Sequence, residues 1–275
     1  MCTLDGCGSG PDLPPISVGS RERRLFLAGL ASLPLATVLS YPELAAAQAS
    51  RARPMDIQLP DGTAVSGIIA RPETTPAPAV VLIHEWWGLN DQIKTMATEL
   101  ANLGYIAYAI DLYGGEVAST PEEARSLMGA VDAEKATDQL VAAIKTMRLV
   151  DGSNGKIGTV GWCFGGAWSI NASLAASVDA TVVYYGRLPQ EADELASLRG
   201  PVLGHFGTED ESIDEVMVGG FERAMAEAGK ADMLDVNWYT AGHAFANPTG
   251  SRYDQEDAAL AWSRTQTFFA RHLQG

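Results

Sequence analysis

Residues 157–166 read IGTVGWCFGG, and this stretch decides the fold expected of the chain. An apolar run, Ile157–Val160, leads into Gly161-x-Cys163-x-Gly165 and then into a helix of small residues. This strand–turn–helix context is typical of a nucleophile elbow, with cysteine where serine is commoner. The flanking glycines relieve crowding at a turn that strains its central residue. We therefore predict that Cys163 stands above a sheet, at the start of the next helix.

The expected position of Cys163 at a helix N-terminus favours catalytic chemistry. The partial positive charge at that helix end favours the thiolate, which is the nucleophilic form of cysteine. The alternative is an inert cysteine packed between strand and helix. The chain has three cysteines, too few for a disulfide framework, and Cys2 and Cys7 lie in an N-terminal leader. The context of Cys163 therefore predicts a nucleophile.

Strand-like and helical patterns alternate along the chain on both sides of this turn. The expected strands are 56–59, 65–71, 79–83, 106–110, 157–161, 180–185, 202–206 and 236–239. The expected helices are 90–103, 121–130, 133–148, 165–176, 191–198, 213–228 and 256–272. Two runs, 79–83 and 181–185, are apolar throughout, as in strands buried on both faces. The pattern predicts an α/β fold, a mostly parallel sheet flanked by helices on both faces. Its first two strands are expected to form an antiparallel hairpin at one edge.

Composition and charge exclude several classes of protein. The 275 residues are 47% hydrophobic and 19% charged, which is ordinary globular composition and excludes collagen-like and disordered chains. With 19 basic and 34 acidic residues the net charge is -15, which argues against a nucleic-acid partner. No paired His or Cys residues occur at metal-binding spacings, and we expect neither metal nor cofactor. Residues 50–275 show no linker or repeat and are expected to form one domain.

The first 49 residues have the layout of a cleaved export signal. Residues 21–27 read RERRLFL, an apolar stretch follows to Leu39, and residues 47–49 read AQA. The paired arginines resemble the twin-arginine type of signal, which would engage the twin-arginine export machinery. The alternative is an uncleaved anchor, but the stretch is short for a membrane span and Pro34 interrupts it. We expect cleavage after residue 49, a periplasmic or secreted protein, and no stable membrane insertion afterwards.

A cysteine nucleophile needs a base, and the base needs a carboxylate that orients it. His243 lies in the loop after the last expected strand and is the candidate base. Asp210 and Glu209 follow the preceding strand, and either could orient the imidazole. The order Cys163, Asp210, His243 places each residue at the carboxyl end of a successive strand, where open α/β sheets hold their sites. His205 lies inside a strand and is expected to be a packed core residue.

A third loop, residues 84–89, reads HEWWGL after the strand 79–83. In this architecture that loop supplies one amide of an oxyanion hole, and the residue after the nucleophile supplies the other. The expected donors are the backbone N–H groups of Trp86 and Phe164. Glu85 is unusual there, because an unpaired carboxylate at the mouth of the site would repel a developing oxyanion. The alternative is that Glu85 is a surface residue bonded to backbone.

Six segments, in order, resemble the dienelactone hydrolase family of α/β-hydrolases over most of residues 55–273. They are Glu85 with Gly88-Leu89-Asn90, Asp111-Leu112-Tyr113, Gly161-x-Cys163-x-Gly165-Gly166, Tyr184-Tyr185-Gly186, Phe206-Gly207-x-x-Asp210 and Ala241-Gly242-His243-x-Phe245. The resemblance implies cleavage of an enol-lactone or related ester through a thioester acyl-enzyme. Cys163 would be the nucleophile, His243 the base and then the acid, and Asp210 the orienting carboxylate. Glu85 would help to deprotonate the thiol when substrate arrives.

The expected substrate contacts come from aromatic residues in or beside these segments, namely Trp87, Tyr113, Tyr185 and Phe245. Dienelactone-cleaving members of the family bind the substrate carboxylate with two arginines, and Gly115 and Asn247 occupy those positions here. Neither residue can supply a bidentate guanidinium. We therefore expect hydrolysis of a small ester or lactone without a large preference for carboxylated substrates. A non-enzymatic small-molecule-binding protein and an acyltransferase with the same triad are the alternatives.

Overall fold

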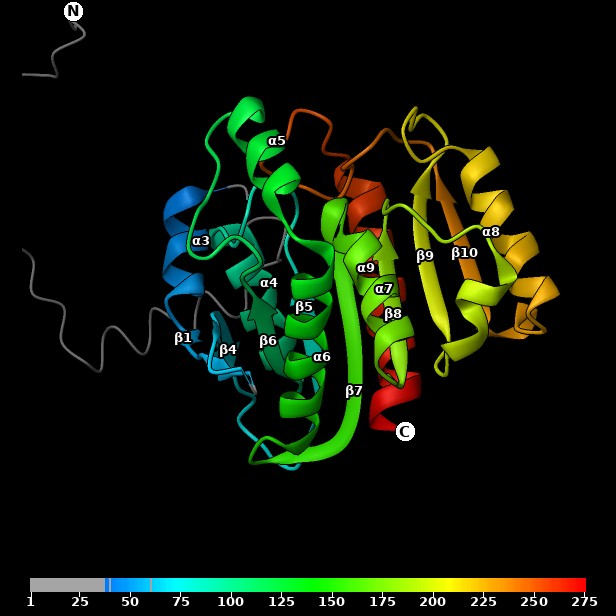
Figure 1. The fold of residues 1–275 in the computed structure, drawn as a ribbon. Coiled ribbons are helices and arrows are strands. Elements are labelled where there is room, and N and C mark those ends of the chain that lie inside the picture. The colour runs from blue at the N-terminus through cyan, green and yellow to red at the C-terminus, as the bar shows by residue number, and fades with distance from the viewer. Residues whose placement is uncertain (1–37, 40, 60) are drawn as a thin grey trace, which may run out of the picture.

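A computed structural model describes residues 38–275 except residues 40 and 60, and it contains an eight-stranded sheet (Figure 1). The strand order is β1-β4-β6-β5-β7-β8-β9-β10. The bounds are β1 Arg53–Pro54, β4 Gly67–Ala70, β5 Ala77–Ile83, β6 Ile106–Ile110, β7 Ser153–Trp162, β8 Ala180–Tyr184, β9 Val202–Gly207 and β10 Leu234–Tyr239. From β6 to β10 all neighbours are parallel, while β4 pairs with β6 and β1 with β4 in antiparallel fashion. The predicted α/β-hydrolase fold with a mostly parallel sheet is confirmed.

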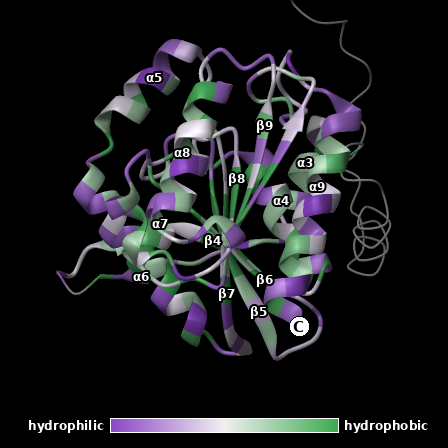
Figure 2. Ribbon diagram, turned by 90° about the vertical axis from the view of Figure 1, so that its right-hand side faces the viewer, coloured by the Kyte–Doolittle hydropathy of each residue, from purple (hydrophilic) through white to green (hydrophobic). Residues whose placement is uncertain are grey.

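Helices cover both faces of this sheet. Those described are α3 Pro42–Ala49, α4 Asp91–Asn102, α5 Pro121–Ala130, α6 Ala133–Leu149, α7 Phe164–Ala175, α8 Glu215–Glu227 and α9 Gln255–Phe269. In Figure 2, α6, α7 and α8 lie on one side of the sheet, and α4, α9 and α3 lie on the other. Asn90, Asp132, Asp214 and Asp254 each accept a hydrogen bond from an amide of the first turn. These side chains act as acceptors for N–H groups of the first turn, which have no acceptor within the helix.

The core lies on both faces of the sheet. Every residue of β5, β6 and β8 is buried, which confirms that the two apolar runs are central strands. His205, in β9, is fully buried, with Nδ1 2.8 Å from the Tyr239 hydroxyl and Nε2 3.0 Å from Thr265 Oγ1. Burial lowers the pKa of His205 to about 3, so it is a neutral core residue, as expected.

The N-terminal hairpin differs from the prediction. The strands β2 (Ile57–Gln58) and β3 (Ala64–Val65) do pair antiparallel, but they form a separate two-stranded sheet. The chain leaves this pairing at Ser66, whose carbonyl accepts from Asp111 N at 2.9 Å, and the next four residues pair with β6 as β4. The edge of the main sheet is instead β1, which the sequence pattern did not indicate.

Three predicted helices also differ in detail. The segment expected at 191–198 is a short 3₁₀ helix, Ala192–Ser197. A second short 3₁₀ helix, Ala231–Met233, precedes β10. The last helix ends in a π-helical turn, Ala270–Gln274. The helix expected from residue 213 begins at Glu215, since Asp214 caps it.

The predicted twin-arginine motif lies outside the described residues, and export stays a prediction. The end of the predicted signal lies within the described residues. There, α3 packs against α4. Thr95 Oγ1 donates to the Ala45 carbonyl at 3.0 Å, and Ala45 and Ala49 are buried. The predicted cut after Ala49 would therefore remove a helix that contacts the fold. Within the described part of the chain, no helix combines the length and the apolar character that a membrane span requires.

Candidate active site

Cys163 occupies the turn between β7 and α7 that the sequence predicted. Its backbone has φ 54° and ψ −114°, a left-handed conformation that is uncommon for a residue with a side chain. Its N–H donates to the Tyr184 carbonyl at 3.0 Å, and its own carbonyl accepts from Gly166 N at 3.0 Å. These two bonds hold the strained turn. The Cys163 side chain is partly exposed, so a ligand can reach it.

The glycines beside Cys163 are required because backbone segments approach them closely. A Cβ at Gly161 would lie 1.9 Å from the Gly165 carbonyl oxygen, and a Cβ at Gly165 would lie 2.2 Å from the Ile83 carbonyl oxygen. Neither neighbour is a flexible side chain that could move aside. The elbow therefore needs glycine at both positions for reasons of space.

The three predicted triad residues lie together at the carboxyl end of the sheet. His243 Nε2 is 3.1 Å from Cys163 Sγ, and His243 Nδ1 is 2.7 Å from Asp210 Oδ2. Asp210 is buried, and its other oxygen accepts from Ser212 N at 2.8 Å. Glu209 is exposed, so the open choice between the two acids falls on Asp210 as the neighbour of His243.

The charges of this trio stabilise one another. Burial alone lowers the pKa of His243, but the hydrogen bonds and charges of Asp210 and Cys163 outweigh it and raise that pKa to about 10. Burial raises the pKa of Asp210, and the bond and charge of His243 with two backbone N–H groups bring it below its usual value. The arrangement therefore favours a protonated imidazole beside the Asp210 carboxylate at neutral pH.

Replacing Asp210 by asparagine is expected to make stability less dependent on pH above neutrality. Because the folded pKa of His243 is raised, the stabilisation by Asp210 is complete below about pH 6.5 and is lost as the pH rises toward 10. We expect the difference in free energy of unfolding between wild type and Asp210→Asn to shrink by at least about 1.4 kcal/mol, one pKa unit, over that window. Urea unfolding at pH 6.5, 8 and 10 measures it. A constant difference would contradict the ion pair.

Glu85 is buried, which corrects the alternative of a surface residue. Its two carboxyl oxygens accept from the Tyr185 hydroxyl at 3.2 Å and from Asn247 Nδ2 at 2.5 Å. Burial raises the pKa of Glu85, and the two donors only partly oppose that rise. Asn247 thus holds Glu85, a role that its place in the sequence did not suggest.

The two expected oxyanion donors lie on different elements, Trp86 in the loop after β5 and Phe164 at the start of α7. Phe164 is the first residue of α7, where an N–H has no intrahelical acceptor. Neither Trp86 N nor Phe164 N donates to a backbone carbonyl in the loops and turns that the structure describes. Both amides are therefore available to a ligand oxygen.

His84 fixes the loop that carries Trp86, and sequence reasoning missed this role. It is fully buried, with Nδ1 2.6 Å from the Glu85 carbonyl and Nε2 accepting from Leu112 N at 3.2 Å. Burial lowers the pKa of His84. A neutral ring with Nδ1 protonated satisfies both contacts. The signal available in the sequence was a histidine directly after a buried strand.

Of the aromatic residues expected to contact the substrate, Tyr185 lies beside His243, and the Trp87 ring packs against Trp86 at 5.1 Å between ring centroids. The Tyr185 ring lies 5.3 Å from that of His243 and 5.5 Å from that of Phe245. Tyr185 has φ 37°, so a second strained residue lies beside the triad.

The hydroxyl of Tyr113 lacks a partner in this site. It is buried and makes no hydrogen bond, and burial together with the charge of Cys163 raises the pKa of Tyr113. An unpaired buried hydroxyl costs free energy unless a ligand satisfies it. Tyr113 is therefore placed to donate to a ligand near Cys163.

The two positions that depart from the family pattern carry no cation. Gly115 is exposed and donates its N–H to Asp111 Oδ2 at 2.6 Å, and Asn247 is committed to Glu85. The exposed Arg252 packs beside Gly242, next to His243. Among the residues that the structure describes, no group of three His, Cys, Asp or Glu side chains is placed to hold a metal ion.

Comparison with known proteins gives consistent matches. A model of the dienelactone hydrolase family matches residues 65–273. Carboxymethylenebutenolidase of Pseudomonas putida is 32% identical over 231 residues, covering 78% of this chain and 95% of that protein. Carboxymethylenebutenolidase 1 of Cupriavidus pinatubonensis is 28% identical over 228 residues, covering 78% and 95%. The crystal structure of a dienelactone hydrolase-like promiscuous phosphotriesterase from metagenomic libraries is similar with a TM-score of 0.73 and 25% identity, covering 81% and 98%.

Proposed function

The chain belongs to the dienelactone hydrolase family of ester and lactone hydrolases, and we propose that it cleaves its substrate with Cys163, His243 and Asp210. The observation that carries this proposal is the continuous contact from sulfur to imidazole to carboxylate, 3.1 Å and 2.7 Å. Such a chain activates a nucleophile and fixes the tautomer of its base. The proposed substrate is a small ester or enol-lactone.

Acylation begins with attack of the Cys163 thiolate on the substrate carbonyl carbon. The carbonyl oxygen becomes an oxyanion, which accepts hydrogen bonds from the N–H groups of Trp86 and Phe164. Collapse of the tetrahedral intermediate breaks the bond to the leaving oxygen, which takes the Nε2 proton of His243. With an ester, the products of this step are a free alcohol and a thioester on Cys163. With an enol-lactone, the ring opens and the enol stays attached to the acyl chain of the thioester.

Deacylation uses the same groups with a water molecule. His243, now neutral, accepts a proton from water as its oxygen attacks the thioester carbonyl. The second tetrahedral intermediate expels the Cys163 thiolate and releases the carboxylic acid. His243 then carries the proton again, and Asp210 keeps its imidazole oriented throughout. The starting ion pair is restored.

Glu85 has a conditional role in this scheme. Its carboxyl group is held by Tyr185 and Asn247, both neutral donors, rather than by a cation. Release from these donors when substrate binds would let Glu85 accept the thiol proton in molecules where Cys163 is still protonated. Tyr113, Tyr185, Trp87 and Phe245 are the proposed substrate contacts.

A panel of esters and lactones tests the proposed function. With Gly115 and Asn247 in place of guanidinium groups, we expect 4-nitrophenyl acetate and 4-nitrophenyl hemisuccinate to have kcat/KM values within about tenfold of each other. A hydrogen bond to a charged group contributes about 1.5–3 kcal/mol. Without a guanidinium group to bind the substrate carboxylate, the carboxylated ester loses this advantage over the neutral one. A preference above about a hundredfold for the carboxylated ester would contradict this. The same panel in Arg252→Ala measures whether the arginine beside Gly242 contributes, and added alcohols separate hydrolysis from acyl transfer.

A further inference from the structure

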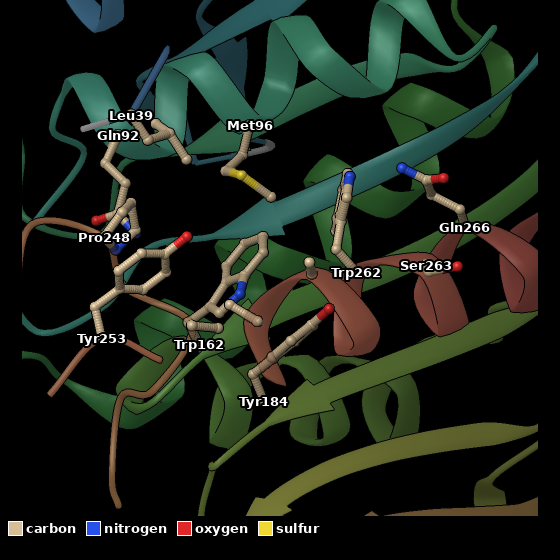
Figure 3. Close-up of a pocket in the computed structure, with 13 residues that line it drawn as sticks. Leu39, Gln92, Met96, Trp162, Tyr184, Pro248, Tyr253, Trp262, Ser263 and Gln266 are labelled. Atoms are coloured by element: carbon tan, nitrogen blue, oxygen red, sulfur yellow. The ribbon is translucent and has the colours of Figure 1, made fainter. Parts of the chain in front are cut away.

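A cavity of about 220 Å³ lies on the face of the sheet covered by α4 and α9 (Figure 3). Its walls come from α4, α9, the ends of β7 and β8, and the segment 246–253 that follows the His243 loop. Aromatic rings make up much of the lining, namely Trp162, Tyr184, Tyr253 and Trp262. No lining residue carries a charge.

Two buried polar atoms of the lining have no hydrogen-bond partner. They are Oε1 of Gln92, a residue only 6% exposed, and Nε1 of Trp262. In Figure 3 the Gln92 side chain extends from α4 toward Pro248 and Tyr253. A buried polar group left unpaired lowers stability, so each such atom requires a particular explanation. Gln92 Oε1 is an acceptor and Trp262 Nε1 is a donor, and both residues line the same cavity.

One further polar group of the wall, the Tyr184 hydroxyl, is already satisfied. The Tyr184 hydroxyl lies 2.7 Å from Thr265 Oγ1, which in turn is 3.0 Å from His205 Nε2. His205 is held by Tyr239 on its other side. This buried chain fixes the Tyr184 ring as a rigid wall. Other polar side chains, Tyr253, Ser263 and Gln266, also line the cavity, but the buried polar atoms of the described lining that lack a partner are Gln92 Oε1 and Trp262 Nε1.

We propose that this cavity binds a small neutral aromatic molecule that carries a hydroxyl group, such as a substituted phenol. An apolar cavity of about 150 Å³ takes benzene, so this one accommodates a single ring with a short substituent. The rings of Trp162, Tyr184 and Trp262 offer edge and face contacts to an aromatic guest. The guest hydroxyl donates to Gln92 Oε1, which no protein group satisfies. A charged ligand is disfavoured because the lining has no opposite charge.

The cavity is separate from the proposed catalytic site. None of Cys163, His243, Asp210 and Glu85 lines it. One wall is Leu39, from the segment that the sequence assigns to the export signal, and every other lining residue lies between 92 and 266. Cleavage of the predicted signal would remove Leu39 and open one side of the cavity. Gln92 and Trp262, which carry the two unpaired atoms, would remain in the wall.

Titration calorimetry on the full chain tests this site, with 4-ethylphenol as the probe and ethylbenzene as its match without the hydroxyl. Cys163 is first alkylated with iodoacetamide, which blocks the catalytic site and removes turnover from the measurement. We expect saturable one-to-one binding of 4-ethylphenol, at least fivefold tighter than that of ethylbenzene. Gln92→Leu is expected to erase this difference, and Trp262→Phe to weaken binding of both probes. Gln255→Leu, the same change at an exposed position of α9, is the control and should change neither.

Three results would overturn the proposal. The first is no saturable binding of 4-ethylphenol, and the second is equal affinity of the wild type for the two probes. The third is binding that the unalkylated protein shows and the alkylated protein has lost. The third would place the phenol in the catalytic site instead. Thermal unfolding of Gln92→Leu keeps the comparison interpretable, since removing an unpaired acceptor should not lower the Tm. Failure of the proposed hydrolysis would leave these outcomes unchanged, because the calorimetry reads binding to the alkylated protein.

Discussion

Replacing Cys163 by alanine is expected to lower kcat for ester hydrolysis by about 10⁴-fold or more, with the fold retained. Removal of a nucleophile leaves only the contribution of oxyanion donors and substrate binding, and losses of up to about 10⁶ are known for triads. Alanine is smaller than cysteine and keeps the backbone bonds to Tyr184 and Gly166, so the Tm should change little. Initial rates with 4-nitrophenyl acetate measure the effect.

The chain offers a matched control for this substitution. Cys2 and Cys7 are the other two thiols, and Cys2→Ala with Cys7→Ala should retain full activity. Intact mass after brief incubation with the activated ester should show one acyl adduct in this control and none in Cys163→Ala. Full hydrolysis by Cys163→Ala would eliminate the proposed nucleophile. An adduct that maps to Cys163 but never turns over would instead support a binding protein that has lost its deacylation step.

Replacing His243 by glutamine is expected to lower kcat by about 10³- to 10⁴-fold, because proton transfer in both steps depends on its imidazole. The effect should not add to that of Cys163→Ala, since the two residues act as a unit. Alkylation of Cys163 by iodoacetamide should also slow at pH 7, as the cation that stabilises the thiolate is gone. A residue with a purely structural role would leave this alkylation rate unchanged.

His272→Gln provides the control for this second prediction. His272 lies in the last turn of the chain, beside Phe268, and contacts none of the triad residues. We expect its kcat and its alkylation rate to match wild type. If His243→Gln retained more than about a tenth of the activity, the imidazole 3.1 Å from Cys163 Sγ would not be the base.

The turn at Cys163 and its candidate partners could be predicted from a motif and from the order of the strands. Gly161 is required by backbone crowding from Gly165, within the same turn, whereas the crowding at Gly165 comes from the Ile83 carbonyl of the neighbouring strand. The central strands followed from their uninterrupted apolar runs. His243 and Asp210 followed from the rule that parallel strands bring their carboxyl ends to one edge.

The antiparallel hairpin was predicted correctly, but its separation from the main sheet and the partners of Glu85 could not be predicted, because they depend on contacts remote in sequence. Whether β3 and β4 belong to one sheet is decided at Ser66, by a bond to Asp111. Glu85 is held by Asn247, which lies 162 residues away. Burial also raises its pKa, and burial is a property of the assembled fold.

The sequence by itself determined the alternation of strands and helices, the turn at Cys163, and the candidates that meet there, His243 and an acid of the pair Glu209 and Asp210. These depend on short-range sterics and hydrophobic periodicity, which a chain carries wherever it folds. Only the tertiary structure decided which acid faces His243, what His84 and Asn247 hold, and that Gln92 and Trp262 share a cavity with unpaired polar atoms. Side-chain pairing and desolvation arise when segments that are distant in the sequence pack together. The local sequence of one segment does not specify which other segment it will contact.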